Sequence, residues 1–122
     1  MEFKLYQCQH CGNIAYKPHD SGVPLVCCGE PMPLMKAGTV EASAEKHIPV
    51  VAQNGSDVTV TVGSVIHPMV EGHYIPLIAA VNADTVVFKL PQVGDQPVLE
   101  TKLNGKVTAY EWCNQHGLWK GE

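Results

Sequence analysis

Five cysteines and six histidines are the residues of this 122-residue chain best suited to chemistry, because thiolates and imidazoles bind transition metals. Four of the cysteines fall within the first 28 residues, as Cys8-Gln-His-Cys11 and Cys27-Cys28. Four thiolates complete a tetrahedral site for zinc or iron. The fifth cysteine, Cys113, stands alone, and a histidine, His116, follows three residues later. Cys113 therefore needs a separate explanation, and a second metal site of different chemistry is our hypothesis for it.

The adjacent pair Cys27-Cys28 favours metal ligation over a disulfide. Neighbouring Cα atoms are about 3.8 Å apart, which is shorter than the separation common in disulfides. A disulfide within this pair would be strained, whereas two adjacent thiolates can bind one metal. Ligand count alone leaves zinc and a single iron as equal alternatives.

The candidate ligands of the second site come from segments predicted to be strand ends and loops. They are His47, His67, His73, Cys113 and His116. Any one of these histidines taken alone is more often a hydrogen-bonded loop residue, and a lone cysteine is often a small buried hydrophobe. The five together favour a metal site. Glu45 and Lys46 precede His47, and on their own they would be a solvated charge pair.

Two domains are predicted to position these side chains. Residues 1–36 hold most of the cysteines and few apolar runs, so a bound metal must compensate for a poor core. Residues 37–122 alternate apolar and polar residues, as strands do. Strands are expected at 39–42, 48–53, 57–63, 74–81, 84–90, 98–102 and 106–112. The fold class is therefore all-β, a small metal module followed by an immunoglobulin-like, seven-stranded sandwich.

Two local features qualify this assignment. Asn54-Gly55 and Asn104-Gly105 are predicted to be hairpin turns between neighbouring strands. Pro76 lies inside a predicted strand and lacks a backbone N–H, so that strand is expected to be an edge strand or to contain a bulge.

Composition narrows the possible partners and location. The formal charge is −4, with eight lysines and no arginine, which argues against nucleic acid as a partner. No stretch approaches the roughly 18 apolar residues that span a bilayer. The N-terminal residues lack the apolar core of a signal peptide. A cytoplasmic location without membrane contact is expected.

Residues 6–14 and 25–32, which include Cys27-Cys28-Gly29-Glu30-Pro31-Met32, resemble the desulforedoxin module, which carries one rubredoxin-like iron. Four further segments resemble, in the same order, motifs of the desulfoferrodoxin or iron superoxide reductase family. They are 45–49 (Glu-Lys-His-Ile-Pro), 63–69, 71–75 and 113–119 (Cys-Asn-Gln-His-Gly-Leu-Trp). The resemblance covers nearly the whole chain and points to the two-iron class.

The resemblance implies two non-haem irons per chain. The first is held by Cys8, Cys11, Cys27 and Cys28, and the second by four equatorial imidazoles, from His47, His67, His73 and His116, with Cys113 as the axial thiolate. The implied activity is the one-electron reduction of superoxide to hydrogen peroxide at the second iron. Lys46 would attract the anion, and Glu45 would be the carboxylate that covers the open position of the oxidised iron.

Three partner assignments complete the resemblance: superoxide as substrate, a rubredoxin-type electron donor and a homodimer. Asn114 and nearby backbone amides are expected to hydrogen-bond the Cys113 sulfur and adjust its donor strength.

Two alternative functions stay open from the residues alone. One is an electron carrier that uses only the four-cysteine iron, and the other is a non-catalytic interaction module with a zinc knuckle. The metal content and the visible spectrum separate them.

Overall fold

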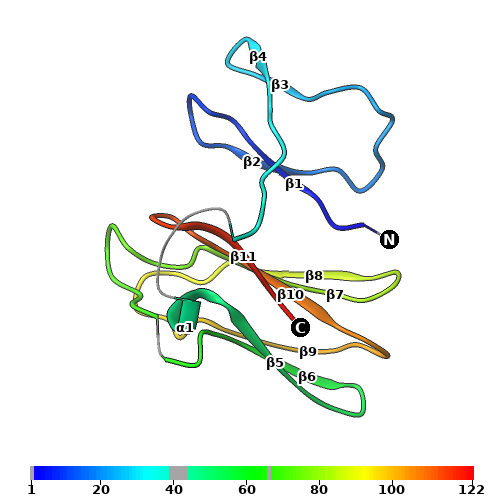
Figure 1. Cartoon of the computed structure of the whole chain (residues 1–122), viewed down its shortest axis with the longest axis vertical. Helices are drawn as coiled ribbons and strands as arrows, with labels where there is room; N and C mark the ends of the chain where they lie inside the picture. The colour runs from blue at the N-terminus through cyan, green and yellow to red at the C-terminus, as the bar shows by residue number, and fades with distance from the viewer. Residues whose placement is uncertain (1, 39–43, 66) are drawn as a thin grey trace. The chain divides into compact units, whose positions relative to one another are not determined.

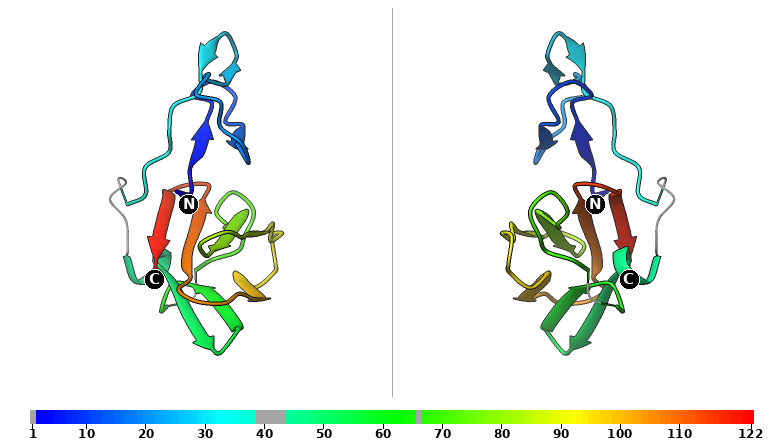
Figure 2. Two further views of the ribbon diagram at one scale, coloured as in Figure 1. Left: turned by 90° about the vertical axis from the view of Figure 1, so that its right-hand side faces the viewer. Right: turned by 90° about the vertical axis from the view of Figure 1, so that its left-hand side faces the viewer.

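The structure is a computed structural model of the chain, and it describes residues 2–38, 44–65 and 67–122. The chain forms two compact units, Glu2–Lys36 and Ala37–Glu122, which we describe separately. Figures 1 and 2 show their strands and a short helix. The elements are β1 (Leu5–Gln7), β2 (Ile14–Tyr16), β3 (Val26–Cys27), β4 (Glu30–Pro31), α1 (Ala44–His47), β5 (Pro49–Asn54), β6 (Asp57–Val62), β7 (Leu77–Val81), β8 (Val86–Lys89), β9 (Val98–Lys102), β10 (Thr108–Cys113) and β11 (Gly117–Gly121).

The first unit is built from two short antiparallel hairpins, β1-β2 and β3-β4. Of its described residues only Leu5 and Cys8 are buried. Several apolar side chains are instead exposed, namely Val23, Leu25, Val26 and Leu34. So small a core cannot hold 35 residues together unaided, which agrees with the expected dependence on a metal.

The second unit is a β-sandwich of two antiparallel sheets. A four-stranded sheet has the order β11-β10-β7-β8, and a three-stranded sheet has the order β5-β6-β9. Their inward-facing residues form one hydrophobic core, which contains Val58, Val60 and Val62 from β6 and Ile78 and Ala80 from β7. The alternation of buried and more exposed residues along β6 and β10 is the period of two that the sequence predicts for half-buried strands.

The all-β fold class and the sandwich are confirmed, but two local predictions are wrong. β7 begins at Leu77, directly after Pro76, and lies between β10 and β8, so it is a central strand. Pro76 is compatible with this because it precedes the first hydrogen-bonded residue. The Asn104-Gly105 turn does not close a hairpin, because β9 belongs to the three-stranded sheet and β10 to the other.

Other strand predictions have mixed outcomes. The Asn54-Gly55 turn closes the β5-β6 hairpin in full register, with Gly55 at φ 61°. The strand predicted at 39–42 lies outside the described residues. Strand β11 was not predicted, since Leu118-Trp119-Lys120 between glycines carries little period-two signal. With β11 included, the described part of the sandwich has seven strands.

Antiparallel topology brings the candidate ligands of the second site to one end of the sandwich. The end of β6, the start of β7 and the end of β10 lie at this same end of the sandwich, because consecutive antiparallel strands reverse direction. Helix α1 ends just before β5 begins, so His47 joins the same end. No helix among the described residues has the length and apolar character needed to cross a membrane.

Candidate metal centres

Four thiols of the first unit lie together. Their sulfur atoms, from Cys8, Cys11, Cys27 and Cys28, lie within 4.8 Å of one another. The Cys11 and Cys27 sulfurs are 3.5 Å apart. A tetrahedral ion with metal–sulfur bonds of about 2.3 Å requires sulfur–sulfur distances of about 3.8 Å. All five cysteines of the chain are free of disulfides, so the donor set fits one tetrahedral metal ion.

Two hairpin turns present these thiols. The Cys8 sulfur accepts hydrogen bonds of 3.4 Å from the backbone N–H groups of His10 and Cys11. These two bonds lower the pKa of Cys8 to about 6, because they stabilise the thiolate. Cys28 adopts a φ of 52°, which lets adjacent Cys27 and Cys28 direct both sulfurs to one point. His10 is exposed and pairs with Glu30 at 3.2 Å, so it is not part of the donor set.

A second group lies at one end of the sandwich. Its ligand atoms also lie within 4.8 Å of one another and come from His47, His67, His73, Cys113 and His116. His47 is the last residue of α1, and Cys113 is the last of β10. His67 and His73 belong to the connection between β6 and β7, and His116 to the turn between β10 and β11. All five residues singled out in the sequence are thus neighbours.

The four imidazoles form a closed square in the order 47, 67, 73, 116. Neighbouring ring centroids are 4.7, 4.8, 5.1 and 4.8 Å apart around the square. Each neighbouring pair is close to perpendicular, with interplanar angles between 76° and 88°. His47 Nε2 lies 3.1 Å from His67 Nε2 and 3.0 Å from His116 Nδ1. Metal–nitrogen bonds of about 2.1 Å at right angles would give nitrogen separations of about 3.0 Å.

The nitrogen atoms at the centre of the square cannot all be satisfied by hydrogen bonds to one another. One hydrogen on His47 Nε2 could satisfy only one of its two nitrogen neighbours. His73 Nε2 is buried and has no hydrogen-bond partner. A buried unpaired polar atom costs about 1–3 kcal/mol. A metal ion that accepts all these lone pairs removes the conflict, so the residues fit a bound metal.

His67 is held in the neutral state that a ligand needs. It is buried, and burial lowers its pKa to about 4, with the neighbouring imidazoles acting in the same direction. Its Nδ1 lies 2.7 Å from the carbonyl oxygen of Pro68. An Nδ1–H that donates to this carbonyl leaves the lone pair on Nε2, which faces the centre of the square.

Cys113 completes the donor set from within the core. Its side chain is 0 % exposed, and its sulfur lies 3.5 Å from His67 Nε2 and 3.9 Å from His116 Nδ1. Burial raises the pKa of Cys113, whereas backbone N–H groups of Gln115 and His116 donate to the sulfur and lower it. The expectation of backbone amides on this sulfur therefore agrees with the structure.

Asn114 makes a different contact from the one expected for it. Its Oδ1 accepts a 3.0 Å hydrogen bond from the Tyr74 N–H, and its Nδ2 donates to the Gly72 carbonyl at 3.2 Å. The Gln115 amide also donates to Gly72. These bonds tie the turn that carries Cys113 and His116 to the loop that carries His73. The side chain of Asn114 thus holds a ligand loop and is turned away from the thiol.

Glu45 and Lys46 occupy the single turn of α1, and both side chains are exposed. Gly63 packs against this turn from the end of β6. A Cβ at Gly63 would lie 2.7 Å from the carbonyl oxygens of Glu45 and Lys46, and its φ is +78°. The Val65 N–H also donates to the Glu45 carbonyl at 2.9 Å. Sequence reasoning did not single out Gly63, and its place directly after a strand is a signal only for a turn.

Glu111 was not singled out in the sequence either, and it lies on the same strand as the thiol of Cys113. It is on the inward face of β10, two residues before Cys113, and is 0 % exposed. Neither carboxyl oxygen has a hydrogen-bond partner. Burial raises its pKa to about 9, so the group is neutral at pH 7. The regular alternation of β10 gave its inward direction, but the sequence gives no reason for a carboxyl there.

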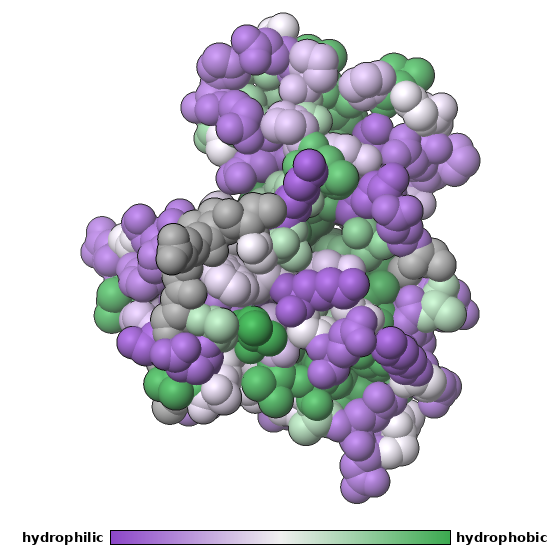
Figure 3. All heavy atoms as spheres, viewed as in Figure 1, coloured by the Kyte–Doolittle hydropathy of each residue, from purple (hydrophilic) through white to green (hydrophobic). Residues whose placement is uncertain are grey.

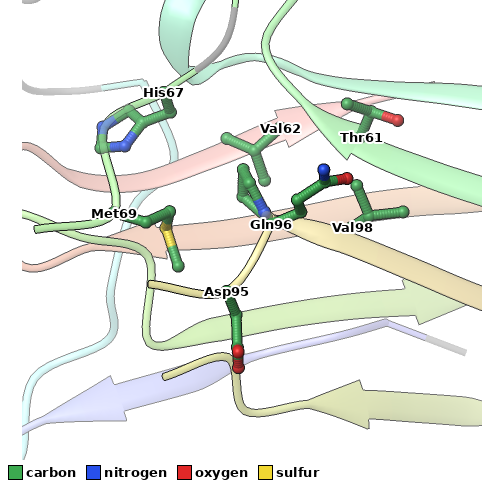
Figure 4. A pocket seen from close by; sticks show the side chains of 8 residues that line it. Thr61, Val62, His67, Met69, Asp95, Gln96 and Val98 are labelled. Carbon is green, nitrogen blue, oxygen red and sulfur yellow. The ribbon is translucent and has the colours of Figure 1, made fainter. Parts of the chain in front are cut away.

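A pocket of about 440 Å³ that is partly open to solvent borders the second site at His67. Figure 4 shows the lining side chains, with His67 at the upper left above Met69, Gln96 near the centre and Asp95 below them. Only His67 of the five clustered residues lines it. The chemistry of this end of the sandwich therefore belongs to the imidazole square and not to the pocket.

Comparison with known proteins agrees with both donor sets. Residues 39–122 match the family described as Desulfoferrodoxin, and residues 1–35 match Desulfoferrodoxin, N-terminal domain. Desulfoferrodoxin from Nitratidesulfovibrio vulgaris is 49 % identical over 122 residues, which covers 99 % of this chain and 97 % of that protein. The desulfoferrodoxin homolog from Archaeoglobus fulgidus is 44 % identical over 118 residues, covering 96 % and 94 %.

Solved structures give the same result. The superoxide reductase from Treponema pallidum aligns with a TM-score of 0.80 and 33 % identity, covering 100 % of both chains. The superoxide reductase (1Fe-SOR) from Giardia intestinalis aligns with a TM-score of 0.57 and 26 % identity, covering 63 % of this chain and 95 % of the other. The four-cysteine group and the four-histidine, one-cysteine group match the two iron sites of desulfoferrodoxins. Because the family matches extend over both units and the relatives align almost end to end, the chain belongs to the desulfoferrodoxin family.

Proposed function

We propose that this chain is a two-iron superoxide reductase that acts at the histidine–cysteine site. The observation that supports this best is the closed square of four imidazoles beside a buried thiol, in a chain of the desulfoferrodoxin family. Its full-length structural relative from Treponema pallidum is a superoxide reductase. Each turnover consumes one superoxide, one electron and two protons and yields one hydrogen peroxide, without release of oxygen.

The reactive iron would be held by the imidazoles of His47, His67, His73 and His116 and by the thiolate of Cys113. Ferrous iron, when bound, supplies the electron for superoxide, and the thiolate tunes its potential. The neutral state of His67 and the burial of Cys113 support this set. The first iron is proposed to be held by Cys8, Cys11, Cys27 and Cys28, which makes residues 1–36 the iron module and 37–122 the reductase domain.

Lys46 and Glu45 are proposed to act on the reactants. Both are exposed and belong to the one-turn helix that ends in the ligand His47. Superoxide is a small anion, so a lysine ammonium beside the site attracts it and orients water for proton delivery. The Glu45 carboxylate is proposed to cover the site between turnovers.

The electron donor, assembly and location are also proposals. A small one-electron donor of the rubredoxin type would reduce the oxidised iron, and the chain would work as a homodimer in the cytoplasm. Reduced rubredoxin mixed with the oxidised protein should restore the ferrous spectrum at a rate that rises with rubredoxin concentration. Sedimentation at micromolar concentration should give twice the chain mass.

Pulsed superoxide tests the activity directly. Reduced protein should form one hydrogen peroxide for each second-site iron that is oxidised, and no oxygen should appear. Oxygen evolution without net oxidation of iron would instead identify a dismutase. Protein with only the four-cysteine iron bound is the control, and it should give no fast peroxide formation.

A further inference from the structure

The indole of Trp119 contacts two of the five residues of the second site. Its ring stacks on the imidazole of His47, with centroids 5.1 Å apart and an interplanar angle of 25°. Its Nε1–H donates a hydrogen bond of 3.1 Å to the backbone carbonyl of His116. One side chain on β11 therefore joins two ligand residues that lie 69 positions apart in the sequence.

Burial alone does not account for these contacts. Trp119 is 7 % exposed, which is typical of a tryptophan that only fills a core. The main hydrophobic cluster of the described residues, however, does not include it. Its stacked face and its one polar atom are both directed at residues of the metal site. An aromatic chosen only for its volume would not need either alignment.

His47 is the ligand whose own element is least able to orient it. Helix α1 has four residues, a single turn, and isolated turns of helix are unstable because nucleation costs more than one hydrogen bond returns. Cys113 is fixed instead by the β10-β11 pairing, which runs from Ala109–Gly121 to Cys113–Gly117, whereas His116 lies in the turn between these two strands. A flat indole against the His47 ring defines its plane, and this plane decides whether Nε2 meets the other nitrogens.

We propose that Trp119 is a positioning residue of the second iron site. It sets the plane of the His47 imidazole by stacking, and it fixes the His116 backbone by its N–H bond, so that both ligand nitrogens face one point. This inference rests on the proposed second iron site. Trp119 does not touch the reactants, so its effect is exerted through the metal ligands.

The test compares variants of the iron-loaded protein. Trp119→Leu removes the stack and the hydrogen bond, whereas Trp119→Phe keeps an aromatic ring and loses only the hydrogen bond. Trp112 provides the matched control, because it lies on the opposite, more exposed face of the neighbouring strand β10. Trp112→Leu and Trp112→Phe remove the same atoms without touching the imidazole square. Circular dichroism confirms folding, and the measurements are the rate of iron release to a chelator and the visible spectrum of the oxidised second site.

Removal of a side chain that orients a metal ligand typically weakens metal binding by about 10-fold to 100-fold. Trp119→Leu should therefore release second-site iron at least about 10-fold faster than Trp112→Leu, with a shifted absorption band. Trp119→Phe should largely restore the band and release iron about 5-fold faster than Trp112→Phe, as expected for one lost hydrogen bond.

Equal release rates for Trp119→Leu and Trp112→Leu, with unshifted bands, overturn the proposal. If Trp119→Leu does not fold, the Phe pair decides. Equal iron-release rates in Trp119→Phe and Trp112→Phe contradict positioning by the N–H. An absorption band of Trp119→Phe that is displaced as far as that of His47→Ala contradicts positioning by the ring. Wild-type protein with only one iron per chain would refute the proposed function itself. Two irons in the wild type together with no effect at Trp119 would refute only this inference.

Discussion

Cys8 and Cys113 show how the surroundings of one side-chain type set its chemistry. Backbone amides of Cys11 and His10 lower the pKa of Cys8 to about 6, although its side chain is buried. Two amides also reach Cys113, yet burial raises its pKa. A thiolate in the Cys113 position is stable only beside a cation, because an unpaired charge in a core is costly. The thiol of the sandwich is thus linked to metal binding more strongly than the thiol of the module.

Substitution of Lys46 tests whether its positive charge attracts the superoxide anion. Lys46→Ala should slow the second-order reaction with superoxide about twofold to tenfold at low salt and weaken its salt dependence. The iron spectrum should stay unchanged. Lys102→Ala is the control, since it removes the same charge at the far end of β6, where Lys102 is exposed and pairs with Asp57. Pulse radiolysis at several salt concentrations measures both variants, and equal rates would remove Lys46 from the mechanism.

Glu111 tests the cost of a buried carboxyl without partners. Glu111→Leu should raise the free energy of unfolding by about 1–3 kcal/mol at pH 7, because two unpaired oxygens are replaced by apolar atoms. Glu100→Leu, at an exposed position of β9, should change it by less than about 0.5 kcal/mol. Urea unfolding of iron-loaded proteins with equal metal content measures the difference. A loss of stability in Glu111→Leu would mean that the carboxyl has a partner such as a buried water.

At the scale of elements, α1 joins the metal site to the proposed substrate-attracting charge. The same turn carries Glu45 and Lys46 and ends at the buried His47. Four residues cannot keep this geometry alone, so the turn depends on the tight approach of Gly63 and on bonds to the Glu45 carbonyl. Movement of α1 would displace a ligand and both charged side chains together.

The close approach of Gly63 to α1 predicts that adding one methyl group at this position has a measurable effect. Gly63→Ala should destabilise the protein by about 2–4 kcal/mol and weaken iron binding at the second site, because its Cβ would overlap the carbonyls of α1. Gly55→Ala is the control, since Gly55 also has a positive φ of +61° but nothing within 4 Å of the added atom. Denaturation and iron content separate backbone strain from the overlap. Equal losses in the two variants would contradict a special role for Gly63.

At the scale of the whole molecule, the two units depend on their metals to different degrees. The sandwich has a continuous apolar core, whereas the first unit buries only Leu5 and Cys8 among its described residues. Because its core is so small, the first unit gains much of its folding free energy from binding its metal, whereas metal binding is a local event in the second unit. On the face seen in Figure 3, apolar residues reach the surface in small groups between hydrophilic ones.

Loss of the first metal should unfold only the first unit. In Cys8→Ser/Cys11→Ser the iron content should fall from two to one, and the amides of residues 2–36 should lose protection from hydrogen exchange. The amides of β6, β7 and β10 and the spectrum of the second iron should be retained. Cys113→Ser is the complementary control, which should alter the second spectrum and leave residues 2–36 protected. Full protection of the first unit without its metal would contradict this dependence.

Sequence alone determined the donor chemistry and the fold class. The types and spacing of the cysteines indicated the four-thiol group, and the period-two strands indicated an all-β sandwich, because both depend on residues close in the chain. The five residues of the second site were identified largely by their resemblance to a family. Their separations in sequence, from 47 to 116, carry no distance information by themselves.

Tertiary structure decided how those residues meet and what holds them. Which sheet each strand joins is a long-range choice, so β9 and β10 part at Asn104-Gly105 although the turn is typical of a hairpin. The same long-range packing closes the imidazole square, turns Asn114 toward Gly72 and Tyr74, and stacks Trp119 on His47. A side chain's type is written in the sequence, but its partner depends on the packing of both sheets.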